Sequence, residues 1–275
     1  MISYRAIRPS IANAEFVDCY WLLQGTSTPD DVQRIVPDGR PELIIHLANS
    51  FAHQRGAIWE VQPECFIVGQ ISGPMLLRPT GRTNTLGIRF QPHGASRLFR
   101  LPLDELSGRS VPLRDLSPQL DRELSAVRDL HTPTMQISFV DRILQRRFVR
   151  STNKGWLVEA AVREIIASGG TVETAALAGR LNVSLRQLQR RFKDEVGIGP
   201  KLLSRIQRFQ RVFWALESSP AWVDVAVQCG YFDQAHLIND FRYFAGDAPA
   251  SLLSPQTDLA FHFLQSSSKN LKKMS

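Results

Sequence analysis

The sequence predicts an α+β protein in two parts: a small β-barrel or sandwich, then an all-α region in which one helix-turn-helix unit occurs twice. Short apolar or β-branched runs, separated by Gly, Pro and Asp turn residues, fill residues 1–91. Helical periodicity replaces them after residue 117. The pattern of residues 184–200 then returns at 233–249, with apolar residues, glycine and proline in register at an offset of 49.

The composition is typical of a soluble globular protein, and its positive charge permits a polyanionic partner. The 275 residues are 43% apolar and 21% charged, with a net charge of +7. The excess is concentrated in residues 180–211, which hold nine basic and two acidic residues. The N-terminus has no apolar signal core and the chain has no run of 18 apolar residues, so we expect a cytoplasmic protein without a membrane contact. Three scattered cysteines favour reduced thiols over disulfides or a zinc site.

Five strands are predicted in the N-terminal half, separated by turn residues. They are Glu42–Leu47, Ala57–Val61, Cys65–Gly69, Met75–Arg78 and Thr85–Phe90. The histidines at 46, 53 and 93 form no His-x-His pair and have no carboxylate at a short fixed spacing, which favours ordinary histidines over metal ligands. No Ser–His–Asp arrangement or phosphate loop is present, so the sequence predicts neither an enzyme nor a bound cofactor.

Two amphipathic helices are predicted at 118–129 and 133–150, each beginning with a Ser-Pro or Thr-Pro pair. Their apolar stripes have two interpretations, which the sequence leaves open. The helices pack against the β domain, or they form a dimer interface. The polar run at 151–155 is the predicted linker to the second half.

The first helix-turn-helix unit combines a small-residue helix at 171–180 with a second helix capped by Ser184. Leu188 and Phe192 face its core. Arg186, Gln189 and Arg190 lie at i, i+3 and i+4, so the three side chains share one exposed stripe. Arginine pairs with guanine and glutamine with adenine in the major groove, so this stripe suits DNA recognition.

A helix from Pro200 to Glu217 separates the two units and carries arginines at three-residue steps. The second unit has a helix at 222–229, a Gly-Tyr-Phe turn, and a helix capped by Asp233. Its outward polar residues are Gln234, His236, Asn239 and Arg242. A final short helix is predicted at 251–253.

The C-terminal half resembles the AraC family of bacterial transcription regulators over residues 156–253. The segments ALAGRLNVSLRQLQRRFKDEVGIGP and VAVQCGYFDQAHLINDFRYFAGDAP carry this resemblance. It implies that the second helix of each unit enters the major groove, on successive turns of one DNA face. The implied base contacts are Arg186, Gln189, Arg190, Gln234, His236 and Asn239. The expected phosphate contacts are Gln187, Lys193, Arg205, Arg208 and Arg242.

The second unit departs from the family pattern. Asn239 stands where many relatives carry a basic residue, and Ala235 is apolar where others are polar. These departures predict that the second unit binds DNA more weakly than the first, or mostly through phosphates.

The N-terminal half is similar to sensor domains of some AraC-like regulators, through VPDGRPELIIHL and GIRFQPHGASRLFRLPLDELSGRSVPL. Such domains resemble small cupin-like barrels. The expected organisation is a sensor domain at 1–115, a helical linker or dimerisation region at 116–150, a DNA-binding domain at 151–255 and a tail at 256–275. The expected partners are double-stranded promoter DNA, a small-molecule effector bound within 1–115, and a second copy of the chain.

The main prediction is therefore a transcription regulator controlled by ligand binding or oligomerisation, with activation and repression both open. Two alternatives come from other classes: a cupin-type enzyme with a helical appendage, and a module whose helical repeats bind protein. Metal bound at His46 and His93 would favour the enzyme. A weak dependence of DNA binding on salt would favour the protein-binding module.

Overall fold

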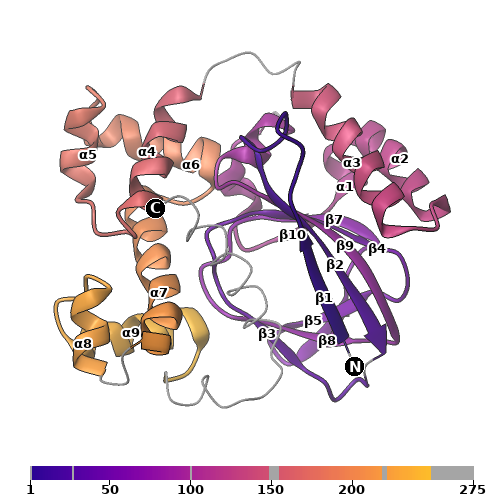
Figure 1. Ribbon diagram of the computed structural model, residues 1–275, viewed down its shortest axis with the longest axis horizontal. Helices are drawn as coiled ribbons and strands as arrows, with labels where there is room; N and C mark the ends of the chain where they lie inside the picture. The colour runs from indigo at the N-terminus through magenta and orange to yellow at the C-terminus, as the bar shows by residue number, and fades with distance from the viewer. Residues whose placement is uncertain (1, 27, 100, 149–154, 219–221, 249–275) are drawn as a thin grey trace.

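The computed structural model describes residues 2–26, 28–99, 101–148, 155–218 and 222–248. The chain forms a β domain and a helical domain that lie side by side, with helices α4 to α9 gathered on one side of the sheets (Figure 1). The predicted α+β arrangement is confirmed. Residues 151–154 of the predicted linker, the short helix at 251–253 and the tail at 256–275 lie outside the described residues.

The β domain consists of two antiparallel sheets. The six-stranded sheet has the order β1 (Ile2–Ile7), β2 (Val17–Thr26), β9 (Arg82–Phe90), β4 (Glu42–His46), β7 (Cys65–Val68) and β10 (Ser110–Pro112). The four-stranded sheet has the order β3 (Gln33–Ile35), β8 (Met75–Pro79), β5 (Phe51–Arg55) and β6 (Ile58–Val61). Within the described ranges no hydrogen-bonded strand pair joins the sheets, so the predicted barrel is two facing sheets that do not close.

Strand β2 is buried on both faces, which explains why its sequence does not alternate. Tyr20 and Leu22 point to a core under the helices, whereas Trp21 and Leu23 point to the other sheet. A strand covered on both sides reads as a continuous apolar run. Gly87 on β9 leaves room for the Trp21 ring, because a Cβ atom at this position would overlap it.

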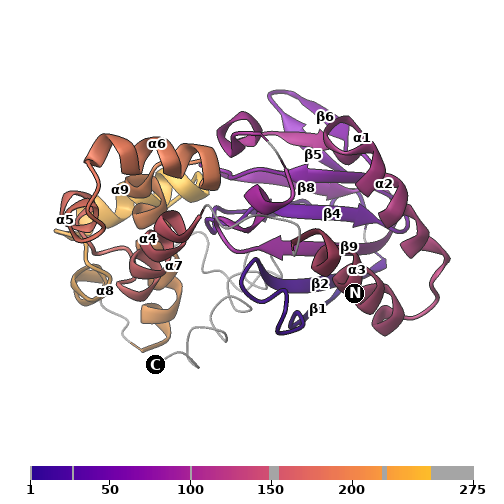
Figure 2. The same cartoon turned by 90° about the horizontal axis from the view of Figure 1, so that it is seen from above.

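The helices after the β domain pack against its six-stranded sheet (Figure 2). They are α1 (Leu113–Leu116), α2 (Pro118–Ser125) and α3 (Pro133–Phe148), with 3-10 turns at Gly94–Arg97 (η1), Leu103–Leu106 (η2) and Ala126–Asp129 (η3). Leu124 and Leu144 are fully buried in that contact. Of the two interpretations of these apolar stripes, the structure shows packing within the chain. The stripes are therefore covered within the chain, and a dimer contact through other parts of residues 116–150 stays a prediction.

The helical domain contains two helix-turn-helix units around one core. Its helices are α4 (Trp156–Ala167), α5 (Thr174–Arg180), α6 (Leu185–Val196), α7 (Pro200–Ser218), α8 (Trp222–Gln228) and α9 (Gln234–Ala245). One hydrophobic cluster runs through all of them. Phe209 of α7 lies at its centre, with its ring centroid 4.9 Å from that of Phe241 and 5.2 Å from that of Phe244. The two units therefore form one folding unit.

The second helices of the two units, α6 and α9, have 12 residues each and begin and end at the 49-residue offset. Ser184 and Gln187 form a capping box at the start of α6. Asp233 caps α9 by accepting a hydrogen bond of 2.7 Å from the His236 N–H. Both helices end at glycines with positive φ, Gly197 and Gly246. The sequence predicted these starts and stops.

Candidate nucleic-acid interface and ligand pocket

The exposed side of α6 is a basic surface that no other part of the described chain covers. Six residues line one shallow hollow on it: Ser184, Arg186, Gln187, Gln189, Arg190 and Lys193. All six are exposed, whereas Leu188 and Phe192 are fully buried. Among the described residues, Arg186 and Arg190 form no ion pair. The three predicted base contacts of the first unit thus lie together on one free face.

Gln187 has a local role in addition to its place on this face. Its side-chain oxygen accepts a hydrogen bond of 2.9 Å from the Ser184 backbone N–H. Its own backbone N–H donates to the Ser184 hydroxyl at 3.2 Å. The side chain thus fixes the start of α6, and its contact with phosphate stays a prediction.

The exposed side of α9 differs in chemistry. Gln234, Asn239 and Arg242 are exposed as predicted. His236 is half-buried, and its ring packs edge-on against Tyr231 at 5.2 Å between centroids. The structure therefore leaves Gln234 and Asn239 free to reach a ligand, while His236 already takes part in packing.

The arginines of α7 connect elements within the helical domain. Arg205 pairs with Asp240 at 2.7 Å, and its guanidinium lies 4.8 Å from the centre of the Tyr243 ring. Arg208 donates to the Gly170 carbonyl at 3.1 Å. These contacts stabilise the fold, and phosphate contacts by Arg205 and Arg208 stay predictions.

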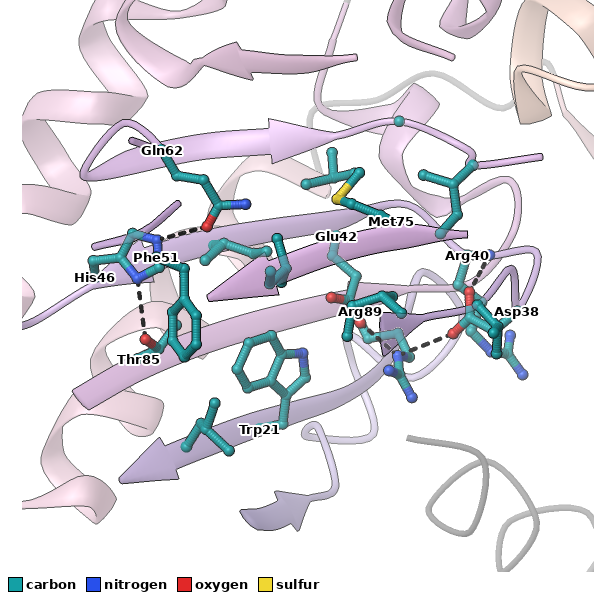
Figure 3. A pocket seen from close by; sticks show the side chains of 18 residues that line it. Trp21, Asp38, Arg40, Glu42, His46, Phe51, Gln62, Met75, Thr85 and Arg89 are labelled. Atoms are coloured by element: carbon teal, nitrogen blue, oxygen red, sulfur yellow. Dashed lines mark hydrogen bonds and ion pairs between the residues drawn. The ribbon is translucent and has the colours of Figure 1, made fainter. Parts of the chain in front are cut away.

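The β domain contains a pocket between its two sheets whose lining residues no sequence pattern predicted. Its volume is about 80 Å³. The middle of the pocket is apolar, with Trp21, Leu23, Ile44, Phe51, Val68, Met75 and Leu77. Polar groups stand at its two ends (Figure 3). Alternate residues of several strands converge on it, so only the folded sheets define it.

One end of the pocket carries a buried charge cluster. Arg89 is 2% exposed and pairs with Glu42 at 2.7 Å and with Asp38 at 3.3 Å. Burial raises the pKa of Glu42, and the neighbouring Arg89 charge opposes that rise. Arg40, at the same end, pairs with Asp18 at 3.5 Å.

The other end carries His46, Gln62 and Thr85. Nε2 of His46 lies 3.2 Å from the Gln62 side-chain oxygen, which only accepts, so Nε2 carries the proton. Nδ1 then accepts from the Thr85 hydroxyl at 3.0 Å. Burial lowers the pKa of His46 to about 4, which keeps the ring neutral. The Gln62 amide nitrogen points away from the ring, into the pocket (Figure 3).

The three histidines that were considered as metal ligands have different surroundings. His53 pairs with Glu60 at 3.7 Å, and His93 is buried, where burial and Arg97 lower its pKa to about 4. Across the ranges that the structure describes, no group of three or more His, Cys, Asp or Glu side chains could hold a metal ion. In the same ranges no helix is long and apolar enough to cross a membrane.

The segment Val36–Arg40 joins the pocket to the helical domain. Val36 and Asp38 line the pocket, and Val36 also packs in the hydrophobic cluster of the helical domain. The carbonyl of Pro37 accepts a hydrogen bond of 2.6 Å from Gln210 of α7. Gly39 is required at the contact because a Cβ atom there would lie 2.7 Å from Leu203, and its φ is +79°.

The β domain also contacts the ends of both exposed helices. The Ser107 hydroxyl donates to the Gly197 carbonyl at the end of α6, at 2.6 Å. Arg34 donates to the Ala245 carbonyl at the end of α9, at 3.0 Å. The β domain therefore holds α6, α7 and α9 at separate points, and leaves the starts of α6 and α9 free.

Two family models match the chain, one in each half. Residues 177–254 match a family described as a helix-turn-helix domain. Residues 5–112 match a family described as a domain of unknown function, DUF6597. No curated protein matches the chain.

The fold is also similar to those of solved bacterial proteins. ToxT from Vibrio cholerae O395 gives a TM-score of 0.45 at 11% identity, over 81% of this chain and 95% of that one. A ToxT structure from Vibrio cholerae with an unsaturated fatty acid bound gives 0.43 at 11% identity, over 94% and 95%. The AraC-like transcriptional activator CuxR gives 0.27 at 14% identity, over 78% and 86%. At these TM-scores and identities the similarity concerns the chain path alone and assigns no residue of the site.

Proposed function

Because the chain is a DNA-binding transcription regulator with an AraC-type helix-turn-helix domain over residues 177–254, we propose that α6 and α9 read two successive major grooves of one operator. The observation that carries this proposal is the repetition of one capped, 12-residue helix whose outer side is free. The 19 residues of α7 span about 28 Å, close to the roughly 34 Å of one DNA turn. A shared core between the units sets this spacing.

We assign base contacts to the residues that lie free at the two helices. They are Arg186, Gln189 and Arg190 on α6, and Gln234 and Asn239 on α9, with His236 as a secondary contact. Lys193 and Arg242, both exposed near the helix ends, are assigned to phosphates together with Gln187. These residue types are those that DNA recognition requires, so we propose that the chain acts by binding rather than by catalysis.

Selection of bound sites from random DNA by the intact protein tests this function. We expect one preferred site made of two half-sites about one helical turn apart. The logarithm of the binding constant should fall steeply with the logarithm of salt concentration, since phosphate contacts release counterions. A flat salt dependence, or enrichment of no sequence, would contradict the proposal and favour a protein-binding role.

The pocket is the proposed effector site of the regulator. A volume of about 80 Å³ and an apolar middle favour a small, largely apolar molecule. The Gln62 amide nitrogen would donate to an acceptor group on it. The charge cluster around Arg89 would then lie beside the other end of the molecule, next to the segment Val36–Arg40.

This segment is the proposed route from effector to DNA. An occupant that moves Val36 disturbs the core of the helical domain, and one that moves Pro37 disturbs its hydrogen bond with Gln210. The resulting shift of α7 would change the relative positions of α6 and α9. Allosteric coupling of this kind is typically worth 1–3 kcal/mol.

A pocket-filling substitution tests the route without knowledge of the effector. Leu77→Phe places additional atoms in the pocket, and we expect it to change operator affinity. In a Gln210→Ala background that change should become smaller, because the connection to α7 is weakened. Lys201→Ala, an exposed change on α7, is the control and should leave the Leu77→Phe effect intact. Equal effects in all backgrounds would exclude this route.

A further inference from the structure

Phe232 is an aromatic residue whose exposure to solvent is not required by the fold. Its side chain is 92% exposed, directly before the Asp233 cap of α9. A residue at this position commonly packs against the fourth residue of the helix, here Leu237, to form a hydrophobic staple. Leu237 is fully buried, whereas Phe232 is almost fully exposed, so the Phe232 ring is not packed as a staple residue would be.

In the first unit the residue at the equivalent position packs against the core. Val183 stands at the position equivalent to Phe232, and it packs against the hydrophobic cluster of the helical domain. The two units are otherwise matched in helix length and in their caps. The exposure of Phe232 is therefore a specific difference between the two units rather than a property of the motif.

Two more differences lie beside Phe232 at the start of α9. Ala235 is exposed and stands where the first unit has Arg186. Gln234 is exposed and stands where the first unit has Leu185. The start of α9 thus presents an aromatic ring, a methyl group and an amide, whereas the start of α6 presents leucine, arginine and glutamine side chains.

Resting on the proposed function, we infer that Phe232 and Ala235 read the C5-methyl group of thymine in the second half-site, and that Gln234 pairs with an adjacent adenine. Phenylalanine and alanine make apolar contacts with the thymine methyl, and glutamine forms two hydrogen bonds with adenine. The starts of recognition helices are the parts that contact base edges. The second unit is then a specific reader of A·T pairs, rather than the weak partner that its lack of basic residues predicted.

Replacing thymine by deoxyuridine in the selected operator tests this inference, because the change removes only the methyl group. We expect wild-type binding to weaken about fourfold for each methyl that the protein contacts. Phe232→Ala should bind the thymine operator less tightly and lose most of the difference between thymine and deoxyuridine. Ala235→Gly should lose a smaller part of the difference in affinity between the thymine and deoxyuridine operators.

Val223→Ala is the matched control, since Val223 is also an exposed apolar residue of the second unit, at 61% exposure on α8. It should keep the wild-type ratio of thymine to deoxyuridine affinity. Circular dichroism of each variant checks that the exposed substitutions leave the fold intact.

Three results would overturn the inference. They are a second half-site without A·T pairs, a Phe232→Ala variant with the wild-type thymine preference, and a Phe232→Ala variant that loses promoter control while its DNA binding is unchanged. In each case a wild-type protein with sequence preference leaves the proposed function intact. A wild-type protein that selects no sequence overturns both.

Discussion

Replacement of Arg89 by methionine is expected to lower the free energy of unfolding by about 3–5 kcal/mol. Arg89 is 2% exposed and holds two carboxylates, those of Glu42 and Asp38, at the end of the pocket. Without the guanidinium these carboxylates lose their cation in a buried site, and one of them must take up a proton or be hydrated. Urea unfolding of the intact chain measures the difference.

Arg82→Met is the control for this experiment, because Arg82 lies on the same strand but is exposed. A change within about 0.5 kcal/mol is expected there. Adding Glu42→Gln and Asp38→Asn to Arg89→Met should recover part of the lost stability, since no uncompensated charge is then left. A loss below 1 kcal/mol for Arg89→Met alone would mean that water enters the pocket and solvates the carboxylates.

Arg190→Ala is expected to weaken operator binding by about 1–3 kcal/mol and to relax the preference at one base position. The side chain is exposed on the free face of α6 and forms no ion pair among the described residues, so its loss removes a contact with DNA and leaves the fold intact. Binding assays with the selected operator, and with each base replaced in turn, measure both quantities.

Lys193→Ala separates base contacts from phosphate contacts on the same helix. It should weaken binding to all sequences about equally and reduce the salt slope by about 1. If Arg190→Ala behaves in the same way, with no change in preference at any position, the assignment of Arg190 to a base edge is wrong.

Local signals in the sequence were sufficient to predict the helical domain. The caps of α6 and α9, their terminal glycines and the 49-residue offset all depend on residues close together in the chain. Strand β2 was not predicted, because a strand buried on both faces has no alternation to read. Periodicity predicted which side of the helices at 118–150 is buried. It did not predict what covers that side, because a sheet of the same chain and another subunit require the same apolar stripe.

The candidate site was predictable only in part for a similar reason. The stripe of Arg186, Gln189 and Arg190 follows from helical spacing alone. The same kind of spacing placed Arg205 and Arg208 in one stripe, but it could not predict that Arg205 pairs with Asp240, 35 residues away. The pocket and its contact with α7 depend on strands far apart in sequence, so no local pattern predicts them.

The points at which the β domain holds α6, α7 and α9 have a consequence for the evolution of the DNA sites. The distance between the two recognition helices depends on one continuous core and on contacts from another domain, through Ser107 and Arg34. Single substitutions on the exposed faces can therefore change which bases are preferred. A change in the number of base pairs between half-sites would require simultaneous changes in both domains, so operators of related regulators should diverge in sequence sooner than in spacing.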